Sequence, residues 1–143
     1  MKKESIKKSR MTNQRRVVYE ELKKLTSHPT ADELYRVVKK RIPKISLGTV
    51  YRNLNLLVKT GVIRRLYFSD SIYRFDANTK KHHHIRCIQC GRVDDIFNFP
   101  EKGLEKIASN LTKYKVLRYK LDFFGVCPKC IKSSKKAYKL KNT

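Results

Sequence analysis

Residues 46–61 have the sequence SLGTVYRNLNLLVKTG, which carries the clearest fold signal in the chain. Ser46 is a favourable helix N-cap, and Gly61 stands where a left-handed C-terminal cap is expected. Apolar residues at helical spacing predict one buried face, made of Leu47, Val50, Tyr51, Leu54, Leu57 and Val58. The opposite face is predicted to carry groups that can contact phosphates and base edges, namely Thr49, Arg52, Asn53, Asn55 and Lys59.

Two shorter helices are predicted upstream of this segment. Thr12 can cap a helix that starts at about residue 13, with Val17, Val18, Leu22 and Leu25 on its apolar stripe. Residues 27–29 break that helix, and residues 30–33, TADE, match a capping box for a second one. The second stripe consists of Leu34, Val37, Val38 and Ile42, and Pro43 is expected to end the helix.

Two β-rich runs follow, residues 62–68 and 71–76, and Ser69-Asp70-Ser71 between them predicts a hairpin turn. Three short helices followed by a two-stranded ribbon form a winged helix-turn-helix, whose third helix enters the DNA major groove. In that geometry Arg52 is the best candidate for a bidentate contact to guanine, and Asn53 could contact adenine. Thr49, Arg15 and Arg16 are expected to hold phosphates, whereas Tyr51 lies near the apolar stripe but could reach a thymine methyl.

The charge of the chain fits a nucleic-acid partner. Lys and Arg number 35 against 12 Asp and Glu, which gives a formal net charge of +23. Such a surplus favours binding to a polyanion, although a merely solubilising lysine-rich surface is the alternative. No apolar run approaches the roughly 20 residues of a membrane span, and the basic N-terminus lacks the apolar segment of a signal peptide. We therefore expect a cytoplasmic protein with no membrane partner.

The cysteines form two matched pairs, Cys87-x-x-Cys90 and Cys127-x-x-Cys130. Two such pairs complete a tetrahedral four-thiolate zinc site, which has no open position for a substrate and therefore serves folding. A redox dithiol or unpaired structural cysteines are the alternatives, but the βαβ context of a thioredoxin is missing.

Three consecutive histidines, residues 82–84, precede the first cysteine pair. On a strand His82 and His84 would share one face, and His83 would point to the other. Candidate partners for a second metal are His28, Asp76, Asp94 and Asp95. A mixed His/Asp set suits Fe(II), Mn(II) or Zn(II). Spacing alone leaves open whether these histidines are ligands or solvated residues of a polar hinge.

At this point the sequence resembles the ferric uptake regulator (Fur) family of metal-dependent repressors, from about residue 10 to residue 130. The segments that carry the resemblance are TNQRRVVYEEL, HPTADELY, SLGTVYRNLNLLVKTGVI, RFDANTKKHHHIRCIQCGRVDDI and FGVCPKC. Within the family the chain is most similar to the peroxide-sensing branch. The resemblance implies an α+β homodimer with a winged-helix DNA-binding domain (residues 1–75), a hinge (76–81), a small α/β dimerisation domain (82–132) and a basic tail (133–143).

The resemblance also implies the functional residues. The structural zinc falls on Cys87, Cys90, Cys127 and Cys130, and the regulatory Fe(II) or Mn(II) falls on His28, Asp76, His82, His84 and Asp95. Asp94 is an alternative ligand, because the segment before Pro100 is one residue longer than expected. Tyr51 and Arg52 would contact bases of an operator, and Arg10 would contact the minor groove.

Aspartates at both carboxylate positions are typical of the peroxide sensors, since the iron sensors more usually carry glutamates. In those sensors Fe(II) reacts with peroxide, and oxidation of ligand histidines, here His28 and His82, releases the metal and then the DNA. Arg52 stands where peroxide sensors can have asparagine, which bears on operator choice. Arg118 and Tyr119 stand where many relatives place a histidine, so a further metal site of the iron and zinc sensors is not expected.

The predicted function is therefore a metal-dependent transcriptional repressor that senses peroxide. An iron- or zinc-availability sensor of the same family is the nearest alternative, and a non-sensing zinc-ribbon module that binds nucleic acid or protein is a more distant one. An enzyme that activates water on a His/Asp metal is not favoured, because the ligands are far apart and no general base or pocket for a small organic substrate is visible.

Overall fold

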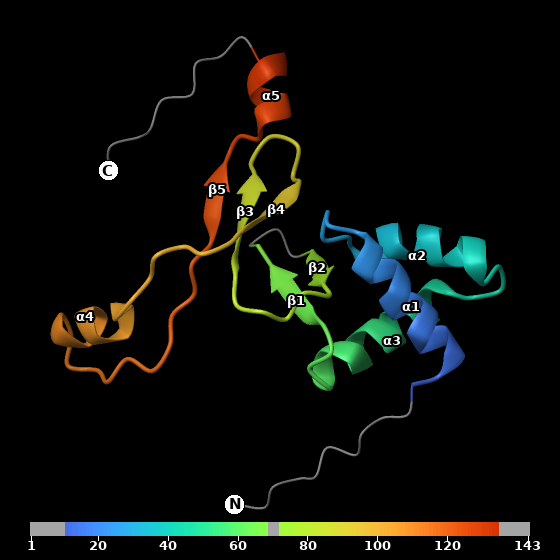
Figure 1. Ribbon diagram of the computed structural model, residues 1–143, viewed down its shortest axis with the longest axis horizontal. Coiled ribbons are helices and arrows are strands. Elements are labelled where there is room, and N and C mark those ends of the chain that lie inside the picture. Colours follow the sequence, from blue (N-terminus) through green and yellow to red (C-terminus); the bar gives the residue numbers. More distant parts are fainter. Residues whose placement is uncertain (1–10, 69–71, 135–143) are drawn as a thin grey trace, which may run out of the picture. The chain divides into compact units, whose positions relative to one another are not determined.

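The computed structural model describes residues 11–68 and 72–134, and it divides the chain into two units, residues 1–81 and 82–143. Helices and strands occur in both units, and the predicted α+β class is confirmed (Figure 1). None of the described helices is long and apolar enough to cross a membrane.

The first unit begins with the three predicted helices, α1 (Asn13–Lys24), α2 (Ala31–Arg41) and α3 (Leu47–Lys59). Their N-caps are the predicted ones: the side chains of Thr12 and Ser46 each accept a backbone N–H from the first turn. Thr30 and Glu33 form the complete capping box, with reciprocal contacts of 3.2 and 3.1 Å. Gly61 follows the C-cap of α3 with a φ of 75°, the left-handed conformation that favours glycine.

Two antiparallel strands, β1 (Arg64–Tyr67) and β2 (Tyr73–Asp76), complete the winged helix-turn-helix. Phe75 of β2 packs into the core between the helices and is 1% exposed. Most of the predicted stripe residues lie in this core, namely Val17, Val18, Leu22, Leu34, Val38, Val50, Leu54 and Leu57, and Ala31, Ile45 and Ile63 join them. The predicted stripe residues Leu25, Val37, Ile42, Leu47 and Val58 are only partly buried, and the prediction that Tyr51 lies on the buried face is wrong, because it is 39% exposed. The hairpin turn predicted at 69–71 lies outside the described residues.

The second unit contains a three-stranded sheet in the order β4-β3-β5. The strand β3 (His83–Cys87) is antiparallel to β4 (Val93–Ile96) and parallel to β5 (Phe123–Gly125). Two short helices accompany the sheet, α4 (Leu104–Asn110) and α5 (Pro128–Ser133). Ser133, which the sequence analysis placed in the basic tail, is thus the last residue of α5, and residues 135–143 lie outside the described part.

Among the described residues of the second unit, Val93 is the one buried hydrophobic side chain besides the cysteines. Its compact cluster consists of Cys87, Cys127 and Cys130 with Val126 packed against them, and no residue of α4 is buried. The cysteine side chains thus form the buried cluster at the position where a larger domain would place its hydrophobic core.

Candidate metal centres and nucleic-acid interface

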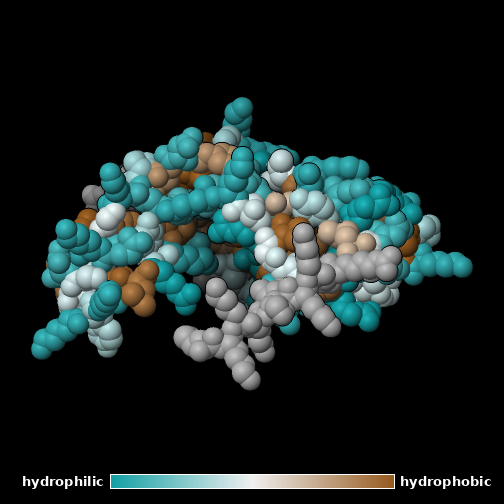
Figure 2. All heavy atoms as spheres, turned by 60° about the horizontal axis from the view of Figure 1, so that its bottom comes forward, coloured by the Kyte–Doolittle hydropathy of each residue, from teal (hydrophilic) through white to brown (hydrophobic). Residues whose placement is uncertain are grey.

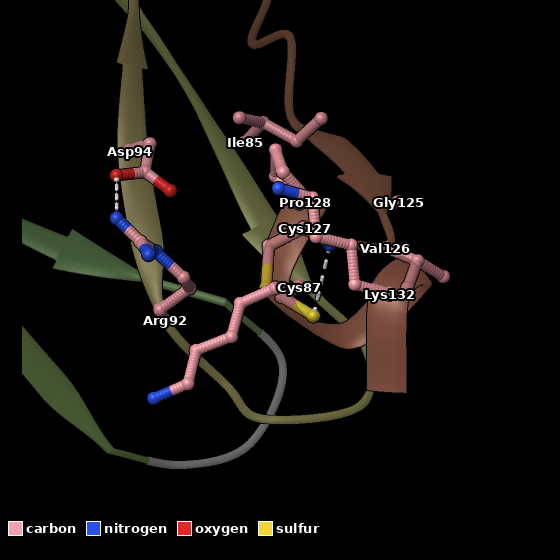
Figure 3. Close-up of a pocket in the computed structure, with 10 residues that line it drawn as sticks. Ile85, Cys87, Arg92, Asp94, Gly125, Val126, Cys127, Pro128 and Lys132 are labelled. Carbon is pink, nitrogen blue, oxygen red and sulfur yellow. Dashed lines mark hydrogen bonds and ion pairs between the residues drawn. The ribbon is translucent and has the colours of Figure 1, made fainter. Parts of the chain in front are cut away.

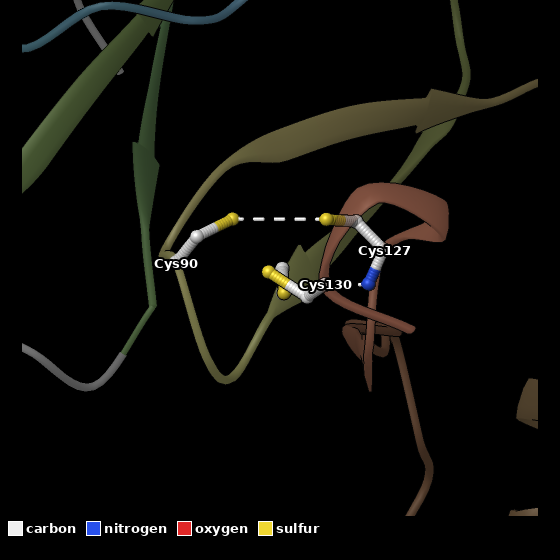
Figure 4. Close-up of side chains that lie close together, drawn as sticks. Cys90, Cys127 and Cys130 are labelled. Carbon is white, nitrogen blue, oxygen red and sulfur yellow. Dashed lines mark hydrogen bonds between the residues drawn. The ribbon is translucent and has the colours of Figure 1, made fainter. Parts of the chain in front are cut away.

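The four cysteines converge in the second unit from the end of β3, the turn after it, and the start of α5 (Figure 4). Their sulfur atoms all lie within 4.8 Å of one another, and the Sγ atoms of Cys90 and Cys127 are 3.8 Å apart. No disulfide joins them. Sulfur atoms bound at about 2.3 Å in a tetrahedral zinc site are about 3.8 Å apart, so the arrangement fits zinc. This is the structural zinc site.

Backbone groups prepare the cluster for a metal cation. The Cys127 N–H donates to Cys87 Sγ at 3.3 Å (Figure 3). N–H groups of Cys90 and Cys127 lower the pKa of Cys87 to about 6, so this thiol is largely ionised at neutral pH. A side-chain hydrogen bond with Cys127 first, and then burial, raise the pKa of Cys130 to about 12. Binding of zinc therefore displaces protons from the cluster, and it is favoured by rising pH.

A hollow of about 650 Å³ lies beside the cluster, between β3, β4 and the start of α5 (Figure 3). Its wall is largely apolar, with Ile85, Val126 and Pro128. Arg92 and Asp94 face one another across its rim at 2.8 Å, so the two charges neutralise each other there. The hollow borders Cys87 and Cys127 of the cluster.

In the first unit, His28 and Asp76 form a buried pair. His28 Nδ1 lies 3.7 Å from Asp76 Oδ1, with side-chain exposures of 3% and 5%. His28 has a φ of 50°, which is rare for a residue other than glycine. The wing holds this conformation, because the Arg74 guanidinium donates to the His28 carbonyl at 3.2 Å. Strain that the surroundings impose is typical of ligand sites.

Asp76 is oriented by the chain that follows it. Its Oδ1 atom accepts the Asn78 N–H at 2.8 Å, and Asn78 Oδ1 accepts the Lys80 N–H at 3.1 Å. These two successive side-chain turns fall within residues 76–81, for which a hinge was predicted. Hydrogen bonds of this kind fix the direction of a carboxylate ligand.

In the second unit, His82 and His84 share one carboxylate. Asp95 Oδ1 lies 3.1 Å from His82 Nε2 and 3.3 Å from His84 Nε2, and both histidines are buried. Register explains the contact, because Asp95 stands directly opposite His84 in the β3–β4 pair. Asp94 faces the other way and pairs with Arg92. Of the two candidate carboxylates, the structure therefore places Asp95 against the histidines.

His83 lies on the other face of β3, as the strand alternation predicted. Its Nε2 atom is 2.7 Å from Glu101 Oε1, and the Tyr119 hydroxyl donates to Oε2 of the same carboxylate. This hydrogen bond raises the pKa of Tyr119 to about 12. The sequence analysis missed Glu101, because no spacing rule connects it to a histidine 18 residues away. Tyr119 is engaged in this network through Glu101.

The exposed face of α3 carries most of the predicted DNA contacts. Arg52 is exposed, Tyr51 is 39% exposed, and the Tyr51 hydroxyl donates to Asp32 at 3.4 Å. Thr49 Oγ1 accepts a hydrogen bond from Arg52 at 3.4 Å. Arg16 is exposed on α1 and contacts Asn13. Arg10 lies outside the described residues.

The prediction that Asn53 lies on the exposed face is wrong, because this side chain is 7% exposed. Its amide donates to the Thr49 carbonyl at 3.0 Å and accepts the Arg15 Nε–H at 3.3 Å. Both ends of the amide are thus engaged inside the protein, and Arg15, predicted for phosphate, is partly held by the same contact. The helical wheel places Asn53 at the border of the buried stripe, where periodicity does not decide the face.

Residues 7–124 match the model of the Ferric uptake regulator family, and the chain belongs to this family. Members are metal-responsive transcriptional regulators that bind DNA and dimerise, and they are not enzymes.

Individual relatives fall into more than one branch. Over 122 residues the chain is 38% identical to the peroxide-responsive repressor PerR of Staphylococcus aureus (strain USA300), covering 85% of this chain and 82% of the relative. The solved Campylobacter jejuni peroxide stress regulator is 33% identical with a TM-score of 0.63, covering 82% of this chain and 88% of that one. A zinc-bound manganese uptake regulator is 31% identical with a TM-score of 0.62, covering 82% and 90%.

Proposed function

We propose that this protein is a peroxide-responsive transcriptional repressor, controlled by Fe(II) or Mn(II) and bound to duplex operator DNA as a homodimer. The observation that carries the peroxide assignment is that both carboxylates beside the histidines are aspartates, Asp76 and Asp95. The peroxide sensors of the family share this feature, and the 38% identity to a peroxide-responsive repressor supports the same branch.

In this proposal one regulatory metal takes its ligands from both units, and the ligands are His28, Asp76, His82, His84 and Asp95. Imidazole and carboxylate ligands suit Fe(II) and Mn(II), whereas the thiolates of the zinc site do not. Fe(II) bound by these residues would act as the reductant of peroxide. The side chains that are oxidised in this proposal are His28 and His82. When a ligand from either unit is lost, the metal no longer raises the affinity of the protein for its operator.

Operator contacts are proposed for α3, with Tyr51 and Arg52 at base edges. Thr49, Arg15, Arg16 and Arg10 would bind phosphates or the minor groove. Hydrophilic side chains cover most of the surface seen in Figure 2, and the chain carries a formal net charge of +23.

The homodimer is proposed from the second unit, where large apolar side chains are exposed. Leu111, Leu117 and Tyr114 are 83%, 78% and 80% exposed. The strand β5 lies at one edge of the described sheet order β4-β3-β5. A unit with this much exposed apolar surface fits association with a second copy.

Peroxide sensing is tested with protein that holds its zinc and is loaded anaerobically with Fe(II) or Mn(II). An operator is first obtained by selection from random duplexes, and binding is measured before and after peroxide. We expect the Fe(II) form to release its DNA and to gain oxygen in the peptides that carry His28 and His82. The Mn(II) form is the matched control, and it should keep its DNA and stay unmodified.

The same experiment decides between the candidates. If the Fe(II) form keeps its DNA and gains no oxygen, the peroxide assignment is wrong. The similarity to a manganese uptake regulator favours a metal-availability sensor as the second candidate. Such a sensor would bind its operator only above a threshold metal concentration and ignore peroxide. Binding that is unchanged when the second metal is removed would indicate a non-sensing zinc-ribbon module.

A further inference from the structure

His28 has a backbone conformation that its own sequence disfavours. Its φ is 50°, and the residue that follows it is Pro29. A residue before proline ordinarily has a φ of about −120°, and left-handed values are uncommon outside glycine. His28 lies between α1 and α2 and is 2% exposed, so the surrounding structure must impose this conformation on it.

The strand β2 runs beside this connection and is bound to it. The Phe75 N–H donates to the Pro29 carbonyl at 3.0 Å. Alternate side chains of a strand share one face, so Arg74 and Asp76 lie on the same face of β2 while Phe75 packs into the core. Two neighbouring side chains on that face contact His28.

Arg74 and Asp76 contact different parts of His28. Arg74 Nη1 donates to the His28 carbonyl at 3.2 Å, whereas Asp76 Oδ1 lies 3.7 Å from His28 Nδ1. The first contact restrains the backbone, and the second meets the imidazole. Because the direction of a side chain depends on its own backbone conformation, the Arg74 contact also bears on where the imidazole lies.

Arg74 is itself held in place. Its Nη1 atom lies 3.8 Å from Glu33 Oε2, and its side chain is 14% exposed. The same Glu33 oxygen accepts the Thr30 N–H at 3.1 Å in the capping box of α2, and Thr30 forms an isolated antiparallel bridge with Arg74. The guanidinium thus has a defined position, which is what a group that orients a ligand requires.

We propose that Arg74 is a positioning residue of the regulatory metal site, and that it holds His28 in the conformation that presents the imidazole beside Asp76. The inference rests on the proposed function, in which His28 and Asp76 are ligands, and it adds a residue that does not itself bind the metal. Hydrogen bonds that orient a metal ligand typically contribute about 10-fold to 100-fold in metal affinity. The alternative is that Arg74 only stabilises the fold of the first unit.

The test measures Mn(II) binding by calorimetric titration of protein that retains its zinc. Arg74→Met keeps an unbranched stem but has no donor, and it should weaken Mn(II) binding about tenfold or more. Arg74→Lys restores one donor and the charge, and it should recover part of the loss. Arg41→Met is the matched control, because the Arg41 guanidinium joins α2 to α1 by donating to Glu20 and Glu21. It should lower stability toward urea but leave Mn(II) affinity unchanged.

A double-mutant cycle with His28→Ala separates positioning from general stabilisation. If Arg74 acts through His28, Arg74→Met should cause no further loss of Mn(II) affinity in the His28→Ala background. An equal loss in both backgrounds, or an Arg74→Met protein that binds Mn(II) as tightly as wild type, would show that the positioning proposal is wrong. Should Arg74→Met fail to fold in urea controls, the smaller loss of Arg74→Lys is followed through the same cycle. If the zinc-loaded wild type binds no second metal, the proposed function itself fails.

Discussion

Among single residues, Asn53 shows how a polar side chain on a recognition helix can serve the fold instead of the DNA. Its amide links α3 to α1 through Arg15. We expect Asn53→Ala to lower the free energy of unfolding by about 1–3 kcal/mol, because the Arg15 Nε–H loses a partly buried acceptor. Urea denaturation measures this. The exposed Asn55→Ala is the control and should stay within about 0.5 kcal/mol of wild type.

The neighbouring carboxylates Asp94 and Asp95 give a second prediction for single residues. Asp95→Asn should weaken binding of the second metal by about tenfold or more, because the amide carries no charge and Asp95 is the carboxylate that meets His82 and His84. Asp94→Asn is the matched control and should leave metal affinity unchanged, since Asp94 pairs with Arg92. Calorimetric titration with Mn(II), with zinc retained, compares the two. Equal losses would contradict the ligand assignment.

Glu21 gives a prediction for pH dependence. The Glu21 carboxylate is 8% exposed and contacts Lys24 at 2.8 Å and Arg41 at 3.0 Å. Lys24 first, and then Arg41, lower the pKa of Glu21, although burial opposes them. A lowered folded-state pKa means that the ionised form stabilises the fold above the ordinary value of 4.5 and that this contribution is lost as the pH falls through the lowered value.

The wild type should therefore be more stable than Glu21→Gln at neutral pH, and the difference should shrink below pH 4.5. Urea denaturation of both proteins at each pH gives the difference between their free energies of unfolding. Loss of zinc at low pH affects both proteins equally and therefore cancels in this difference. Glu20→Gln is the control. Because the Glu20 side chain is 38% exposed, its stability difference from wild type should change less with pH. A difference that does not change with pH would show that Glu21 acts through packing alone.

The helices and strands of the two units were predictable to different degrees. The N-caps Thr12, Thr30 and Ser46 and the 3.6-residue spacing specify α1 to α3, because local hydrogen bonds and one buried face agree there. In the second unit only a strand through the histidines and the zinc site of the paired cysteines were anticipated. The strand β4 has four residues and α4 buries none, so neither carries a periodic signal.

The candidate sites follow the same division. The CxxC spacing alone indicates the zinc cluster, since two cysteines three positions apart can present both sulfur atoms to one ion through a local turn of the chain. The contacts of Asp95, Glu101 and Asn53 depend on strand register and helix packing, which are set by residues far away in the chain. Sequence spacing therefore identified the ligand types but not which carboxylate faces which histidine.

The dependence of the second unit on its cysteines is a prediction about elements. Structural zinc in small peptides binds with about 10–16 kcal/mol, which exceeds the stability of a typical domain. We expect removal of zinc by a strong chelator to unfold β3, β4, β5 and α5 but to leave α1, α2 and α3 folded, since their core contains no cysteine. Methyl NMR signals of Val18 and Leu54 report the first unit, and those of Val93 report the second. Simultaneous loss of all three would contradict independent folding.

For the whole molecule, the proposed regulatory metal makes DNA binding and metal binding one thermodynamic system. If a metal with ligands in both units raises operator affinity by some factor, the operator must raise metal affinity by the same factor, typically about 5-fold to 150-fold. Mn(II) suits the measurement because it avoids oxidation of the ligands. Operator affinity with and without Mn(II), and Mn(II) affinity with and without operator, should therefore give one coupling factor.

Variants from each unit test where that coupling arises. His28→Ala in the first unit and His84→Ala in the second should each reduce the coupling factor to about 1, although neither residue lies on α3. Both variants should keep the weak, metal-independent DNA binding and the tightly held zinc, and Asp94→Asn should keep full coupling. If His28→Ala retained coupling while His84→Ala lost it, the metal would act within the second unit alone, and metal control of DNA binding would have to operate through the dimer.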